Sequence, residues 1–196
     1  MKKIKFLVTL LSMAFIVFGM ISIASADTIT ITPDTEMMFF LGFATNPTDA
    51  QLTTASGYAG PWTELYKQEV GGAEVGDFAD SYQTFFTPTT DPKGATIIYD
   101  GDPDPYINGN PIYLLVKDGK HGHYLFNLSA ITIDDSTYSW NGQDTIILSG
   151  FYPDGGSISH ISIYGTSVPS VPEPATLLLL GFGLVGLAGV GSKFKK

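Results

Sequence analysis

The chain contains no cysteine and no arginine, and both absences narrow the classes of protein that it can belong to. Without cysteine there is no disulfide bond and no lipid-modified cysteine of the bacterial lipoprotein type. Stability must therefore come from a hydrophobic core or from bound ions. All positive charge comes from ten lysines, and six of them stand at residues 2–5 and 193–196. The chain has no basic patch, so the sequence predicts no nucleic-acid partner.

Residues 27–170 are the size of one domain and are strongly acidic. They hold four lysines against 18 aspartates and glutamates, a formal net charge of −14. A surface of this charge repels nucleic acid and anionic lipid. It suits solubility, divalent cations or a neutral polysaccharide.

The N-terminus has the layout of a secretory signal peptide. A basic region at residues 1–5 precedes an apolar run at residues 6–23, and an Ala-Ser-Ala sequence ends at Ala26. This order matches the three regions that signal peptidase recognises. We expect cleavage between Ala26 and Asp27 and export of the chain through the inner membrane.

Short β-branched and aromatic runs, separated by Gly, Pro, Asn and Asp, make up residues 27–165. We find no convincing helical periodicity there, so the pattern predicts an all-β, antiparallel β-sandwich with a jelly-roll-like layout. The run at residues 37–43 suggests a central strand, and residues 45–60 suggest a polar loop. The predicted strands are residues 28–32, 37–43, 62–69, 81–87, 95–99, 112–117, 123–128, 138–140, 145–151 and 158–164.

Two dipeptides predict tight turns in the second half of the chain. Asp118-Gly119 and Asn141-Gly142 each stand between apolar runs, and both central residues of a type I′ turn need positive φ. We therefore expect two hairpins in an antiparallel meander. The strand at residues 112–117 has apolar side chains at both even and odd positions, which predicts burial on both faces.

The C-terminus combines a Pro-Glu-Pro sequence, an uncharged Gly/Leu run and a basic end. Residues 175–191 form the 17-residue uncharged run. As a helix it would span about 26 Å, just short of a hydrocarbon core about 30 Å thick. The prolines keep Glu173 extended and accessible, and the lysines favour a cytoplasmic C-terminus. On these grounds a permanent anchor and a removable sorting signal fit equally well.

This three-part order resembles the PEP-CTERM sorting signal of Gram-negative bacterial surface proteins. The resemblance implies cleavage near Pro172, Glu173 and Pro174 by exosortase, a membrane-embedded cysteine protease. It also implies a membrane-anchored precursor and export to the cell surface or the exopolysaccharide matrix. The last strand, within residues 156–165, also resembles that of many PEP-CTERM proteins of unassigned activity.

We therefore expect a chain of four segments, processed by signal peptidase and by exosortase. The segments are a secretory signal peptide with a signal helix at residues 1–26, a β-sandwich domain at residues 27–165, a linker at residues 166–170, and a sorting signal with a transmembrane helix at residues 171–196.

The most acidic loop is a candidate calcium site. Asp100, Asp102 and Asp104 alternate there, and Asn108 adds an amide oxygen. Crowded hard oxygen ligands suit Ca²⁺, although prolines stand where an EF-hand needs Gly and Glu. The alternative is a proline-stiffened turn whose acids face water. Apart from this calcium we expect no cofactor.

The three histidines are a second candidate metal site. His121 and His123 stand two residues apart near a strand start, a spacing that allows both to ligate zinc or copper. The third ligand would be His160 or an acid from a neighbouring strand. The alternative is a polar strand start with unrelated imidazoles.

Two tryptophans are the first candidates for carbohydrate contacts. Trp62 and Trp140 stand beside turn sequences, and exposed rings on a β-sandwich can stack on sugar rings. The alternative is that the rings fill the core.

The sequence shows no catalytic motif. No serine stands in a G-x-S-x-G motif, and Asp134-Asp135 would point to opposite faces of a strand. We therefore expect a non-enzymatic structural or carbohydrate-associated protein. A secreted polysaccharide hydrolase is the main alternative. The Thr-x-Thr-x-Thr pattern at residues 28–32 makes an ice-binding protein a remote one.

Overall fold

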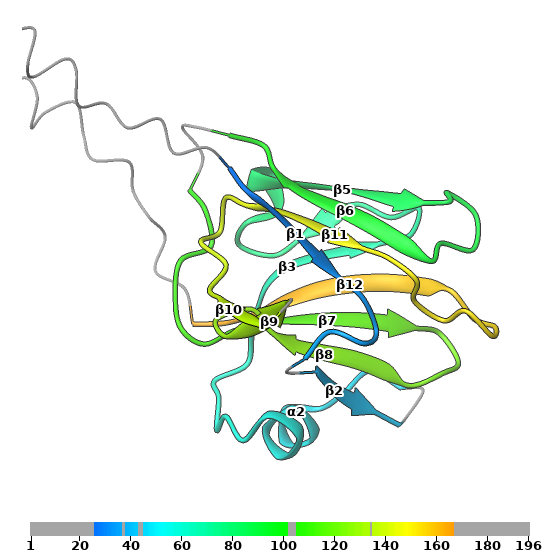
Figure 1. The fold of residues 1–196 in the computed structure, drawn as a ribbon, viewed down its shortest axis with the longest axis horizontal. Helices are drawn as coiled ribbons and strands as arrows, with labels where there is room; N and C mark the ends of the chain where they lie inside the picture. The colour runs from blue at the N-terminus through cyan, green and yellow to red at the C-terminus, as the bar shows by residue number, and fades with distance from the viewer. Residues whose placement is uncertain (1–25, 37, 43–44, 102–104, 134, 167–196) are drawn as a thin grey trace, which may run out of the picture.

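The computed structural model describes residues 26–36, 38–42, 45–101, 105–133 and 135–166. Within these residues two large β-sheets pack against each other as in a sandwich, and a two-stranded sheet lies at one end (Figure 1). The four-stranded sheet has the order β1-β11-β6-β5, and the six-stranded sheet has the order β2-β8-β7-β12-β3-β4. The strands are β1 (Thr28–Ile31), β2 (Met38–Leu41), β3 (Thr63–Glu69), β4 (Glu74–Val75), β5 (Tyr82–Thr87), β6 (Gly94–Tyr99), β7 (Ile112–Asp118), β8 (His123–Asn127), β9 (Ile131–Ile133), β10 (Ser136–Tyr138), β11 (Thr145–Leu148) and β12 (Ile158–Gly165).

The predicted mostly-β, sandwich-like fold is confirmed, and each predicted strand overlaps an observed one. The predicted antiparallel pairing holds for the described strand pairs except one: β1 pairs with β11 in parallel, Thr28 opposite Thr145 and Ile31 opposite Leu148. The sequence also missed the short strands β4 and β9. Alternation of side chains predicts where strands lie, but it does not set the direction in which distant strands pair.

Strand β7 is buried along its whole length, as predicted. Ile112, Leu114 and Val116 face the main core between the sheets, whereas Tyr113 and Leu115 join a second apolar cluster on the other face. That second cluster explains why β7 is apolar at both its even and its odd positions.

Helix α2 (Asp49–Ser56) covers the second cluster and corrects the prediction of a polar loop at residues 45–60. Thr48 and Gln51 form a capping box at its start, and Gly57 ends it in the left-handed conformation. Leu52 is its one buried side chain, so the helix has almost no apolar periodicity for a sequence reading to detect. The helix lies on the side of the molecule away from the four-stranded sheet (Figure 1). A short 3₁₀ turn, η1 (Ala79–Ser81), precedes β5.

The predicted central strand at residues 37–43 is an edge strand. In the described part of the chain β2 pairs only with β8, and its Phe40 side chain is 56% exposed. An apolar run does not distinguish an edge strand from a central one when the second apolar cluster lies beside it.

The two turn predictions have different outcomes. The hairpin of β7 and β8 is confirmed, but neither Asp118 nor Gly119 has positive φ, so the turn is not type I′. The Asn141-Gly142 hairpin is wrong, because β10 pairs with β9 while β11 pairs with β6 and β1. The predicted meander therefore does not form.

In the described ranges no helix is long and apolar enough to cross a membrane. The predicted signal helix, except for Ala26, and the predicted transmembrane helix lie outside those ranges, as does the predicted linker except for Thr166.

Candidate functional site

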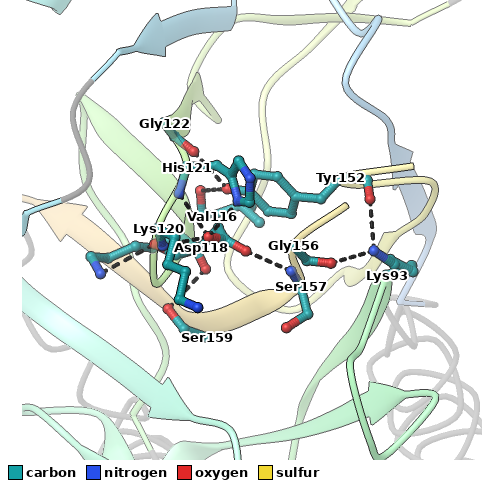
Figure 2. Close-up of polar contacts among 11 residues, drawn as sticks. Lys93, Val116, Asp118, Lys120, His121, Gly122, Tyr152, Gly156, Ser157 and Ser159 are labelled. Carbon is teal, nitrogen blue, oxygen red and sulfur yellow. Dashed lines mark hydrogen bonds and ion pairs between the residues drawn. The ribbon is translucent and has the colours of Figure 1, made fainter. Parts of the chain in front are cut away.

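The most connected polar group in the described part of the chain is the carboxylate of Asp118, at the end of β7 (Figure 2). Its Oδ1 accepts hydrogen bonds from the backbone N–H of Lys120 at 2.5 Å and of His121 at 2.8 Å. The same oxygen accepts from the Nδ1–H of His121 at 2.9 Å. Its Oδ2 accepts from the backbone N–H of Ser157 at 2.5 Å. One side chain therefore joins the β7–β8 turn to the loop before β12.

These contacts determine the protonation state of Asp118, which is only 3% exposed. Burial is the largest single influence and raises the pKa, but the hydrogen bonds from Lys120, His121 and Ser157 together lower the pKa of the carboxyl to about 2. Asp118 is therefore ionised at neutral pH and is unsuited to act as a general acid.

The loop before β12 approaches the Asp118 carboxylate closely. Gly156 has φ +79°, and a Cβ there would meet Asp118 Oδ2 and the His121 ring. Lys93 Nζ donates to the carbonyl oxygens of Tyr152, at 2.7 Å, and of Gly156. Figure 2 shows these contacts side by side, so a lysine and an aspartate fix the same loop from two directions.

Tyr152 fills the space behind the turn. Its hydroxyl lies 3.1 Å from the carbonyl oxygen of Val116 and 3.0 Å from that of Gly122, and its ring lies against the His121 ring. Burial first, and then the nearby charge of Asp118, raise the pKa of the Tyr152 hydroxyl. The hydroxyl stays protonated and acts as a donor.

An open depression of about 700 Å³ lies beside this cluster. Asp118 and His121 correspond to two of the three residues of a Ser-His-Asp triad, the arrangement that activates a serine nucleophile. Ser157 and Ser159 line the same depression, but the Ser159 hydroxyl donates to the Lys117 carbonyl oxygen at 3.1 Å. Among the described residues neither serine hydroxyl bonds to the imidazole, so this geometry does not assemble a nucleophilic triad. The i, i+3 spacing of Asp118 and His121 was the one sequence signal for this pair.

A second polar cluster crosses the outer face of the six-stranded sheet. His160 lies opposite Lys117 on β7 and opposite Glu69 on β3. Burial, followed by the charges of Lys67 and Lys117, lowers the pKa of His160 to about 4. Burial also lowers the pKa of His123, whose Nε2 lies 2.9 Å from the Thr45 carbonyl oxygen. Both imidazoles are therefore neutral at pH 7.

The predicted chelating pair of histidines on one strand is not observed. His121 lies in the turn, where it is bound to Asp118, and only His123 lies on β8. Across the described ranges no group of three His, Asp or Glu side chains is arranged to hold a metal ion.

The predicted calcium loop is described only in part. Asp102 and Asp104 lie outside the described residues. The Asp100 carboxylate accepts a hydrogen bond from Gln83 Nε2 at 2.9 Å, and Asn108 is exposed. The calcium site therefore remains a prediction.

The prediction that Trp62 and Trp140 are exposed is wrong. Trp62 is 9% exposed in the second apolar cluster, and its Nε1–H donates to Thr53 Oγ1 at 3.0 Å. Trp140 is 6% exposed in the main core and donates to the Asp144 carbonyl oxygen at 2.8 Å. Each ring buries its apolar body and satisfies its one donor, which removes the basis for stacking a sugar on either.

The fold and the site together define a β-sandwich-like protein whose best-connected ionised group ties two loops together. The chain also carries the PEP-CTERM protein-sorting motif, matched over residues 170–193. That motif implies exosortase processing, export and sorting to the cell surface. No curated protein and no solved structure matches the chain. The predicted sorting residues Pro172, Glu173 and Pro174 lie within the matched segment.

Proposed function

We propose that this protein is exported, released by exosortase cleavage at Pro172-Glu173-Pro174, and displayed at the cell surface or in the exopolysaccharide matrix as a non-enzymatic β-sandwich. The observation that carries the proposal is the sorting motif at residues 170–193. It begins shortly after β12 ends at Gly165, so the whole described domain precedes the cleavage point. The signal peptide predicted to end at Ala26 supports the same route.

The contacts of the charged groups around Asp118 support a structural rather than a catalytic function for this cluster. Asp118 is held by backbone donors, and Lys93 is held by backbone carbonyls. A general acid or base needs a pKa near the working pH, and that of Asp118 is about 2. The net charge of −14 on residues 27–170 favours a soluble, non-aggregating component of the matrix.

Mass spectrometry of the protein recovered from the surface of an exosortase-containing Gram-negative host tests the proposal. The recovered chain is expected to begin at Asp27 and to lack residues 175–196. The Glu173→Ala variant is expected to retain its C-terminus and to stay in the membrane fraction. Asp154→Ala, which removes an exposed acid in a loop, is the matched control and is expected to be processed normally. An intact C-terminus on the surface-recovered wild-type protein would overturn the proposal.

A further inference from the structure

The four-stranded sheet differs from the six-stranded sheet of this acidic domain because none of its strands carries a charged side chain. The strand sequences TITI, TIIL, GATIIY and YQTFFT contain no Asp, Glu, Lys, Arg or His. In the six-stranded sheet β3, β4 and β7 carry ionised side chains, whereas β8 and β12 carry only the neutral imidazoles of His123 and His160. The four-stranded sheet is therefore the one of the two large sheets in which no strand carries an ionised side chain.

One face of this sheet packs on the core and the other is open. Ile29, Ile31, Ile97, Ile146 and Leu148 are buried between the sheets. The alternate residues point the other way, because side chains on a strand alternate between faces. Thr28, Thr30, Gln83 and Thr87 are exposed, Phe85 is 53% exposed and Ile98 is 38% exposed.

The strand register sorts these outer side chains into two rows across the sheet. In the first row Thr28 lies opposite Thr145 and Ile98 lies opposite Gln83. The β11–β6 register, with Ile146 opposite Ile97, continues this row from Thr145 to Ile98. The second row is Thr30, Ile147, Thr96 and Phe85. Both rows mix hydroxyl or amide groups with apolar groups. Neighbours within a row lie about 4.8 Å apart, and the rows lie about 6.6 Å apart.

This mixture matches the chemistry of a neutral sugar chain. A pyranose has an apolar C–H face, which suits Phe85, Ile98 and Ile147, and hydroxyl groups at its edge, which suit threonine and glutamine. An uncharged ligand pays no electrostatic cost on a domain with a net charge of −14, whereas an acidic polysaccharide would be repelled. Charge therefore selects a neutral partner for this face.

The size of the face argues against a second copy of the chain as its partner. Four strands of four to six residues cover about 300 Å², from the spacing of strands and of residues along them. A stable protein pair needs about 800 Å² on each partner. The face is large enough for a few sugar rings and too small for a stable dimer.

We propose that the outer face of β1, β11, β6 and β5, with Thr30 and Phe85 at the two ends of its second row, binds a neutral polysaccharide. This proposal rests on the proposed display of the domain in the exopolysaccharide matrix, and it names the partner. The contact is weak and extended, and it replaces Trp62 and Trp140 as the expected sugar-binding surface.

Retention of the exported protein on four insoluble neutral glycans tests the proposal. Cellulose, curdlan, starch and mannan serve as probes, and an alginate gel serves as the anionic control. The protein is expected to bind at least one neutral glycan and not to bind alginate. Phe85→Ala and Thr30→Glu are each expected to weaken that binding about tenfold, since each removes or blocks one contact at an end of the second row.

Two control variants match these changes elsewhere on the surface. Phe40→Ala removes a ring that is 56% exposed, against 53% for Phe85, and Thr137→Glu adds an acid to an exposed position on β10. Both controls are expected to bind as the wild type does. Circular dichroism confirms that each variant is folded, which the exposure of the substituted side chains favours.

Each other outcome overturns the proposal. Retention on none of the four glycans, or equal retention of Phe85→Ala and Phe40→Ala, excludes this face as the binding surface. A dimer that Thr30→Glu dissociates would make a second copy the occupant, and inhibition of ice growth that Thr30→Glu abolishes would make ice the occupant. Normal C-terminal processing without glycan retention overturns this inference alone, whereas an unprocessed C-terminus overturns the proposed function.

Discussion

Replacing Asp118 with asparagine tests whether one carboxylate holds the two loops together. The carboxyl pKa falls from 3.8 to about 2 in the folded protein. A shift of this size corresponds to about 2 kcal/mol of folding free energy at neutral pH. The amide of the Asp118→Asn variant would also turn an N–H₂ group or a weaker acceptor toward the Ser157 N–H. We expect this variant to lower the free energy of unfolding by about 2–4 kcal/mol at pH 7.

The pH dependence distinguishes this mechanism from a general loss of packing. Because folding lowers the pKa of Asp118, the unfolded chain binds its proton first as pH falls. The stabilisation is complete above about pH 5 and is lost as pH falls through 3.8 toward 2. The stability difference between the wild type and Asp118→Asn is therefore expected to shrink over that range.

Urea denaturation of the exported protein at several pH values measures this difference. The fluorescence of Trp62 and Trp140, both buried, reports unfolding. Asp154→Asn is the control, because Asp154 is exposed and lies in the loop next to the same site. A stability difference for Asp118→Asn that is the same at pH 7 and pH 2 would refute the reasoning.

Three further predictions concern other contacts. The pKa of His160 is 6.5 in the unfolded chain and about 4 in the folded chain, so the unfolded chain binds the proton first as pH falls. The free energy of unfolding is therefore expected to fall by up to about 3 kcal/mol between these two pH values. His160→Gln should flatten that part of a thermal-melting profile, and an unchanged profile would contradict the assignment. Gly156→Ala and Gly150→Ala both place alanine at positive φ, but only Gly156 faces Asp118, so its variant should lose more stability in urea, by about 2 kcal/mol. Equal losses would contradict the close approach. The Asp27 N–H donates to Asp144 Oδ1 at 2.8 Å, and cleavage after Ala26 would make that nitrogen an ammonium group. Asp144→Asn should therefore destabilise the processed chain more than the unprocessed chain, by about 0.5 kcal/mol in thermal melts, and equal effects would argue against this pairing.

The sequence predicted the strands well because their alternation is local. Thr28–Ile31 alternates plainly and Ile112–Asp118 begins with a continuous apolar run, and both are strands. Pairing over long distances was not predictable in this way. The parallel contact of β1 with β11 depends on two segments that share no turn, and the Asn141-Gly142 turn does not join strands that pair with each other.

The candidate site was harder to predict because the Asp118 carboxylate is bound mainly by backbone N–H groups, and any residue type except proline can supply such a group. The sequence predicted Asp118 in a type I′ turn, but its carboxylate instead accepts three backbone N–H groups, one of them from Ser157, far along the chain. The exposure of Trp62 and Trp140 was predicted wrongly because a turn nearby in the sequence does not by itself expose a ring. Trp62 packs in the second apolar cluster, and Trp140 packs in the main core. The uncharged sheet face became visible only when the register placed four separate strands side by side.

The parallel pairing of β1 with β11 also bears on when the domain can fold during export. β1 is near the start of the domain and β11 near its end, and the Asp27–Asp144 hydrogen bond joins residues 117 positions apart. The six-stranded sheet likewise needs β12, whose Tyr164 hydroxyl donates to Glu64, 100 positions earlier. Contacts this distant form late, so neither sheet is complete until nearly the whole domain has left the export channel. The segment that follows β12 carries the sorting motif. Completion of the fold and arrival of the cleavage site at the membrane should therefore occur at nearly the same moment.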